Sequence, residues 1–248
     1  ELKKINKKFS QNHIDYIIIK GLPLHLHHHK TPPKRLYLDA DLLIERKDLK
    51  EVIRLLVNLG LKKYSSRLFK KKTKKSSQIS FVKMTKPFPT VIDLHLEPAI
   101  GFTKIRKLNS LLPPTRAFSR HLFKNINSST IEGTSFPLLS LETLLTYLLL
   151  HFFHHNFRGA HRMELIDRLA RGRGVNWEEV KNTIEKFRFQ TFVYPGILLL
   201  RKYYQTPFPK KLIKALKIPP IPRVVSRAMG RIFSPFDAGD RASEGVRR

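Results

Sequence analysis

Two aspartates separated by one residue stand out in an apolar segment of the chain. Asp39 and Asp41 lie in the run LYLDADLLI, from Leu36 to Ile44, whose other residues are typical of a buried β-strand. Successive strand residues point to opposite faces, so the two carboxylates share one face. Like charges this close are costly unless a cation lies between them, and a divalent metal ion with oxygen ligands is a common solution. The pattern predicts a metal site.

A second strand-like segment, Thr90–Leu96, carries Asp93 and His95 on one face and aliphatic residues on the other. If this strand lies beside the first, three carboxylates converge on one face of a sheet. We therefore expect Asp93 to complete the metal site that Asp39 and Asp41 begin.

A third segment could bind phosphate. The short apolar run Tyr16–Ile19 is followed by Lys20 and Gly21. A glycine after a strand lets the backbone approach a phosphate closely, and a neighbouring lysine supplies a positive charge.

The order of these motifs resembles the DNA polymerase beta-like nucleotidyltransferase superfamily. More closely, it is similar to a poorly characterised bacterial branch with Lys-Gly, Arg-x3-Asp-x-Asp and Asp-x-His motifs. Here these motifs are Lys20-Gly21, Arg35 to Asp41, and Asp93-Leu94-His95. The resemblance is good over residues 14–98 and weaker over the rest of the chain. Many members have a serine after the glycine of the first motif, whereas this chain has Leu22.

The resemblance implies a metal-dependent enzyme that transfers a nucleoside monophosphate from a triphosphate such as ATP, with release of pyrophosphate. Asp39 and Asp41 would bind two Mg²⁺ ions, and Asp93 would contact the catalytic ion and help to activate the incoming hydroxyl. Lys20, Gly21 and Arg35 would bind the nucleotide, and His95 would be auxiliary.

The sequence leaves the acceptor open among RNA, a protein side chain and a small molecule such as an aminoglycoside. It also leaves two other functions open. One is a non-catalytic nucleic-acid-binding protein on a nucleotidyltransferase scaffold, and the other is a metal-dependent phosphoester hydrolase.

The charge of the chain is strongly positive. The 248 residues include 48 Lys and Arg against 19 Asp and Glu, which gives a formal net charge of +29. No acidic residue lies between Glu51 and Asp93 or between Lys186 and Phe236. Because such fields attract polyanions, a nucleic-acid acceptor is a candidate partner. The densest basic run comprises Lys70, Lys71, Lys72, Lys74 and Lys75.

The residue patterns predict an α+β fold, in which a nucleotidyltransferase-like mixed sheet flanked by helices precedes a helical C-terminal domain. We expect a catalytic domain at 1–112, a mainly helical domain at 113–236 and a flexible basic tail at 237–248. Helices are expected at 2–12, 48–59, 140–156, 162–171, 176–188 and 191–204. Strands are expected at 16–19, 36–44, 78–82 and 90–96, with a short hairpin formed by 122–126 and 130–131.

The residue content also argues against cysteine chemistry, a membrane-spanning segment and a zinc-protease site. The chain has no cysteine, which excludes disulfides and thiolate metal sites and is compatible with the cytoplasm, where we place the protein. The longest apolar run, Leu144–Phe153, is too short to cross a membrane. His151 and His155 have the spacing of two zinc ligands on a helix. However, Phe152 occupies the position where a zinc-protease motif has glutamate, so core or site-wall histidines are the favoured interpretation.

Overall fold

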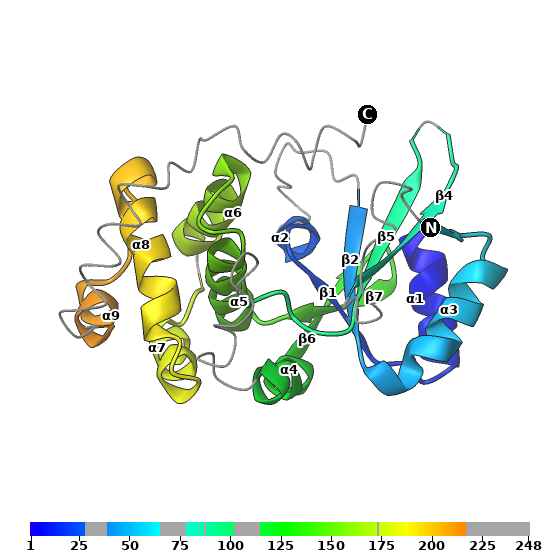
Figure 1. Cartoon of the computed structure of the whole chain (residues 1–248), viewed down its shortest axis with the longest axis horizontal. Helices are drawn as coiled ribbons and strands as arrows, with labels where there is room; N and C mark the ends of the chain where they lie inside the picture. The colour runs from blue at the N-terminus through cyan, green and yellow to red at the C-terminus, as the bar shows by residue number, and fades with distance from the viewer. Residues whose placement is uncertain (28–38, 65–77, 87, 102–114, 173, 217–248) are drawn as a thin grey trace. The chain divides into compact units, whose positions relative to one another are not determined.

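The structure is a computed structural model that describes residues 1–27, 39–64, 78–86, 88–101, 115–172 and 174–216 (Figure 1). The chain divides into two compact units. The first comprises Glu1–Pro98 and Arg116–Ser140, and the second comprises Ala99–Thr115 and Leu141–Arg248. Residues 116–140 thus belong to the sheet-containing unit, on the other side of the expected boundary at residue 112.

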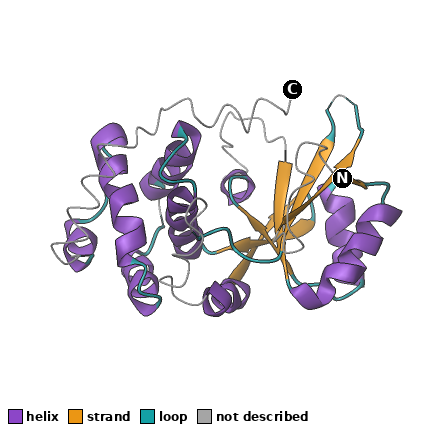
Figure 2. Cartoon of the chain, in the orientation of Figure 1, coloured by secondary structure: helices purple, strands orange, loops and turns teal. Residues whose placement is uncertain are grey.

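All described strands belong to one mixed sheet in the first unit (Figure 2). The strand order is β3-β4-β5-β2-β1-β7-β6. Neighbouring strands are antiparallel, except for the parallel pairs β2–β5 and β1–β7. The strands are β1 (Tyr16–Ile19), β2 (Asp39–Ile44), β3 (Lys62–Tyr64), β4 (Gln78–Lys83), β5 (Thr90–His95), β6 (Ile126–Ile131) and β7 (Thr134–Leu139).

One face of this sheet forms the main core of the first unit. Alternate strand residues, including Ile18, Leu42 and Leu94, are fully buried there. Helices α1 (Leu2–Gln11) and α3 (Leu49–Asn58) contribute to the same core with apolar residues spaced four apart, which are Ile5 and Phe9 on α1 and Val52 and Leu56 on α3. Asp39 and Asp41 of β2 and Asp93 and His95 of β5 therefore lie on the opposite face, which we call the site face.

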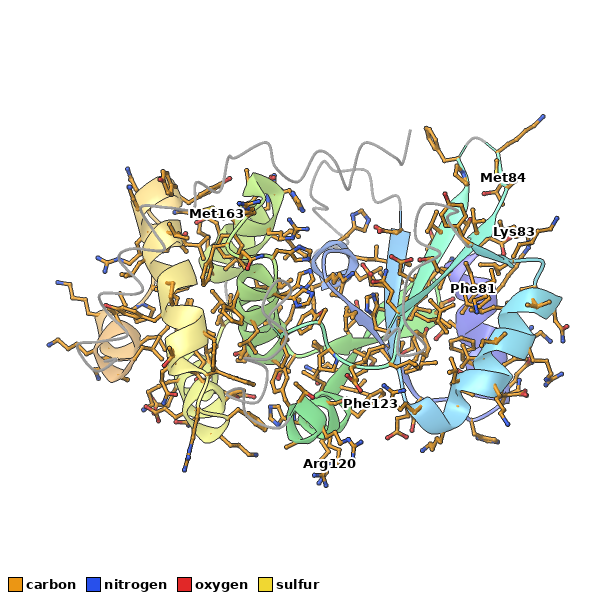
Figure 3. All side chains as sticks on the ribbon, viewed as in Figure 1. Phe81, Lys83, Met84, Arg120, Phe123 and Met163 are labelled. Atoms are coloured by element: carbon orange, nitrogen blue, oxygen red, sulfur yellow. The ribbon has the colours of Figure 1, made fainter. Side chains whose placement is uncertain are left out.

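Residues in and next to β4 illustrate the contrast between the buried core and the solvent-exposed surface. Phe81 is fully buried in the core, whereas Met84, just beyond the end of the strand, is 82 % exposed (Figure 3). Lys83 lies on the core side, where its ammonium donates a hydrogen bond to the Leu59 carbonyl at the end of α3, at 2.8 Å.

Most elements of the first unit match the sequence-based ranges to within a few residues, but the predicted hairpin is wrong in its bounds. Residues 122–124 belong to α4 (Thr115–Lys124), and the hairpin is formed by β6 and β7. Its two-residue turn has positive φ at Glu132 (46°) and Gly133 (73°), the backbone of a tight hairpin turn. The short elements α2 (Leu22–His27), η1 (Arg46–Asp48) and β3 were not predicted.

The second unit is helical throughout its described elements. These are α5 (Leu141–His154), α6 (Ala160–Arg171), α7 (Trp177–Lys186), α8 (Gln190–Tyr204) and α9 (Lys210–Ala215). Met163 on α6 is fully buried in this unit (Figure 3). Helix α7 is capped at its start, because the Asn176 side chain accepts hydrogen bonds from the backbone N–H groups of Glu178 and Glu179.

The predicted fold class is therefore confirmed: a mixed sheet flanked by helices is followed along the chain by a helical unit. Among the described helices, none combines the length and the apolar character needed to span a bilayer.

Candidate metal and nucleotide site

The register of two parallel strands brings the predicted carboxylates together. In the β2–β5 pair, Asp41 is the direct partner of Asp93, and Leu43 is the partner of His95. Asp41 and Asp93 consequently point to the same face of the sheet, opposite the apolar core. All three polar side chains are buried, with exposed fractions of 6 % for Asp41 and 2 % each for Asp93 and His95.

One oxygen of Asp41 accepts two hydrogen bonds. The Lys20 ammonium donates to Asp41 Oδ1 at 2.5 Å, and His95 Nε2 lies 2.8 Å from the same atom. Burial alone would raise the pKa of this carboxyl, but the Lys20 charge and the hydrogen bonds outweigh it, so the Asp41 pKa is lowered from its ordinary value. Asp41 is thus held as a carboxylate at neutral pH.

Lys20 reaches Asp41 from an unusual backbone conformation. It directly follows β1, whose last residue, Ile19, is the cross-strand partner of Asp41. Its φ is 65°, in the left-handed region that non-glycine residues seldom adopt. This turn lets a residue just beyond the strand place its side chain over the neighbouring strand. Gly21 comes next in the chain, at the point where α2 is about to begin.

Asp93 has a different kind of partner. The Gln78 amide nitrogen donates a hydrogen bond to Asp93 Oδ2 at 2.8 Å. Gln78 begins β4, and its cross-strand partner on β5 is His95, so it lies diagonal to Asp93 on the site face. Gln78 was not predicted as a site residue. Both strands were predicted close to their observed ranges, and the missing signal is the antiparallel register that places Gln78 opposite His95.

The donor atoms of Asp41, Asp93 and His95 lie within 4.8 Å of one another. Ligand atoms on opposite sides of a bound ion lie about 4.2 Å apart for Mg²⁺ and about 5 Å apart for Ca²⁺. Two carboxylates and an imidazole at this spacing fit one divalent ion. Asp39 shares the face but lies at the start of β2 beside Val91, where it is half-buried and outside this group of three.

Of the two charged residues predicted to bind the nucleotide, the structure describes Lys20 but not Arg35. Lys20 lies at the site, as the hydrogen bond to Asp41 demonstrates. Arg35 falls outside the described residues, as does the basic run from Lys70 to Lys75.

The histidines of α5 are engaged within the second unit. His151 Nδ1 lies 3.2 Å from the Ala99 carbonyl oxygen, and His154 Nδ1 lies 2.6 Å from that of Gly101. The rings of His151 and His154 stack at 5.9 Å. Within the described ranges, the group formed by Asp41, Asp93 and His95 is the one that has the spacing of metal ligands.

Asp167 on α6 is engaged by two side chains of the second unit. Arg171 Nε donates to both of its carboxylate oxygens at 2.9 Å, and the buried Thr206 hydroxyl donates to Oδ1 at 2.6 Å. The Thr206 bond connects α6 to the segment that follows α8.

Comparison with solved structures gives matches of low sequence identity. The lincosamide antibiotic adenylyltransferase LnuA with bound lincomycin matches with 14 % identity and a TM-score of 0.42, over 68 % of this chain and 94 % of that one. ANT(2'')-Ia in complex with adenylyl-2''-tobramycin matches with 12 % identity and a TM-score of 0.46, over 76 % and 95 %. An antigenic nucleotidyltransferase-like protein from Paracoccidioides brasiliensis matches with 14 % identity and a TM-score of 0.48, over 86 % and 90 %.

No curated protein sequence matches the chain. A family described as uncharacterised nucleotidyltransferase matches residues 1–205, which covers both the sheet and most of the helical unit. The chain therefore belongs to this nucleotidyltransferase family.

Proposed function

We propose that this nucleotidyltransferase transfers a nucleoside monophosphate from a nucleoside triphosphate to a hydroxyl acceptor and releases pyrophosphate. The observation that carries the proposal is the pairing of two buried carboxylates, Asp41 and Asp93, in one register position of adjacent parallel strands. Such a pair is unfavourable in the absence of a cation. Asp39, Asp41 and Asp93 would hold two Mg²⁺ ions, with His95 beside them.

The protein residues have separable tasks in this reaction. The acceptor oxygen forms a bond to the α-phosphorus while the bond from that phosphorus to the bridging oxygen breaks, and pyrophosphate leaves. Asp93 accepts the proton of the acceptor hydroxyl. Lys20 and the Gly21 N–H neutralise the departing phosphates, and Arg35 is a further candidate for this task. The bound Mg²⁺ ions supply Lewis-acid stabilisation of the charge that develops on the phosphate oxygens.

A second candidate function is nucleic-acid binding without catalysis. The net charge of +29 favours it. The buried carboxylates weigh against it, because Lys20 offsets only one of the two charges of Asp41 and Asp93, and the remaining negative charge on the site face would repel a polyanion.

Label transfer tests the proposed activity. Purified protein is incubated with each of the four α-labelled NTPs, Mg²⁺ and fractions of a cell lysate, and both transferred label and released pyrophosphate are measured. We expect label on one fraction, with an equal amount of pyrophosphate, and loss of both with EDTA or with the Asp41→Asn variant. Pyrophosphate without transferred label would indicate hydrolysis, and nucleic-acid binding without either product would support the second candidate.

A further inference from the structure

The site face carries an exposed aromatic side chain at the edge of the sheet. From β2 outward, Asp41 pairs with Asp93, Asp93 with Ser80, and Ser80 with Tyr64. Direct cross-strand partners share a face, so Tyr64 lies on the same face as the two carboxylates. Since neighbouring strands are about 4.8 Å apart, the Tyr64 backbone lies about 10 Å from that of Asp93.

The edge strand β3 presents a positive charge beside this ring. Its three residues are all exposed, and the exposed fraction of Tyr64 is 55 %. Lys62 lies two residues before Tyr64 and therefore shares its face, about 6.6 Å away along the strand. Lys63 pairs with the buried Phe81 and lies on the other face. On the site face, the edge thus offers one ring and one ammonium group.

A ring and an ammonium group at this spacing suit a nucleotide. A base stacks on the ring, and its phosphate pairs with the cation. The same charge disfavours polycationic acceptors, because Lys62 and the net charge of +29 would repel them. An uncharged ring-shaped acceptor could stack on Tyr64 but would not be attracted by the charge of Lys62.

We propose that Tyr64 and Lys62 form the acceptor-binding edge of the site and that the acceptor is the end of a single-stranded nucleic acid. This inference rests on the proposed function. With the terminal base on Tyr64, the terminal sugar lies over Ser80, between the ring and the carboxylates. Its hydroxyl oxygen forms the new bond to the α-phosphorus, its proton passes to Asp93, and pyrophosphate leaves.

Binding of a fluorescein-labelled single-stranded oligoribonucleotide, followed by fluorescence anisotropy, tests the inference. Tyr64→Ala should weaken binding about tenfold, and Tyr64→Phe should bind like wild type because it keeps the stacking ring. Lys62→Gln should reduce the slope of log affinity against log salt by about 0.7. Two matched controls should bind like wild type. These are Tyr203→Ala, an exposed tyrosine of the helical unit, and Lys63→Gln, on the other face of the same strand.

NTP binding, measured separately by calorimetry with Mg²⁺, should be the same in all these variants. The inference is overturned if Tyr64→Ala binds the oligonucleotide as tightly as wild type, if the Tyr203→Ala control loses as much affinity, or if wild type does not bind the oligonucleotide. Should wild type bind NTP with Mg²⁺ in any of these cases, the proposed function stands without this acceptor. Absence of Mg²⁺-dependent NTP binding would count against the proposed function itself.

Discussion

The ammonium of Lys20 lies 2.5 Å from Asp41 Oδ1, so a side chain supplies positive charge to a carboxylate that also belongs to the candidate metal group. A metal ion bound to Asp41 would compete with Lys20 for the same oxygen. The ammonium would then be released, and in the proposed reaction the triphosphate would be its new partner. One residue would then stabilise the metal-free protein and, afterwards, the bound nucleotide.

Lys20→Met should consequently bind Mn²⁺ more tightly than wild type in the absence of nucleotide, because nothing competes for Asp41. It should also bind NTP more weakly. Calorimetric titration with Mn²⁺ and then with NTP measures both effects. Lys63→Met, which removes an exposed lysine from the core side of β3, is the matched control. Weaker Mn²⁺ binding by Lys20→Met would contradict the competition.

Asp41→Asn and Asp39→Asn should each abolish Mg²⁺-dependent NTP binding, but their effects on stability should differ. Asp41→Asn leaves the Lys20 charge without its carboxylate in a partly buried position. We expect the free energy of unfolding of the metal-free protein to fall by on the order of 1–2 kcal/mol. Asp39 lies half-buried at the start of β2, so Asp39→Asn should change stability little. Urea unfolding with EDTA present measures this, and wild-type turnover in both variants would refute the metal site.

Asp93→Asn should lower kcat far more than it weakens nucleotide affinity. The asparagine oxygen can still accept the hydrogen bond from Gln78, which preserves the geometry, but it cannot take the proton of the acceptor hydroxyl. His95→Gln should have a smaller effect on kcat. Single-turnover kinetics together with equilibrium NTP binding separate the two quantities. Unchanged turnover with a large loss of affinity in Asp93→Asn would reverse the assigned roles.

Gln78→Leu should reduce turnover about tenfold, because it removes the hydrogen bond that orients Asp93, and the loss of such a supporting contact typically has an effect of this size. The control is Gln11→Leu on α1, where the glutamine is exposed. NTP affinity should be nearly unchanged in both variants. Equal turnover in Gln78→Leu and wild type would mean that Asp93 is held without the amide.

Substitution of the basic run Lys70, Lys71, Lys72, Lys74 and Lys75 by glutamine should weaken nucleic-acid binding and flatten its dependence on salt, with NTP affinity retained. Each lost phosphate contact should change the slope for a single strand by about 0.7. Lys210, Lys211 and Lys214 of α9, changed together to glutamine, provide a control that removes three charges instead of five, so the change in slope is compared per lysine. Identical slopes for wild type and the five-residue variant would leave the run without a role in binding.

The sequence was informative where a pattern is local. Alternation of apolar and polar residues located β2 and β5 and placed Asp93 and His95 on one face, and Asn176 marked the start of α7. The contacts between segments were harder to predict from the sequence. That Lys20 bonds Asp41 depends on a left-handed backbone after β1, which the residue type does not favour. That Gln78 orients Asp93 depends on strand register, and a shift of one residue would have turned Gln78 to the core.

The parallel pairing of β2 and β5 also affects the order in which the protein folds. The antiparallel contact of β1 with β2 closes a comparatively short loop, whereas β5 can take its place only after α3, β3 and β4 have been traversed. Non-local parallel pairing forms slowly because its loop entropy is lost before its contacts are gained. We therefore expect Lys20 to neutralise Asp41 before Asp93 arrives, so that the repulsion between the two carboxylates arises late in folding.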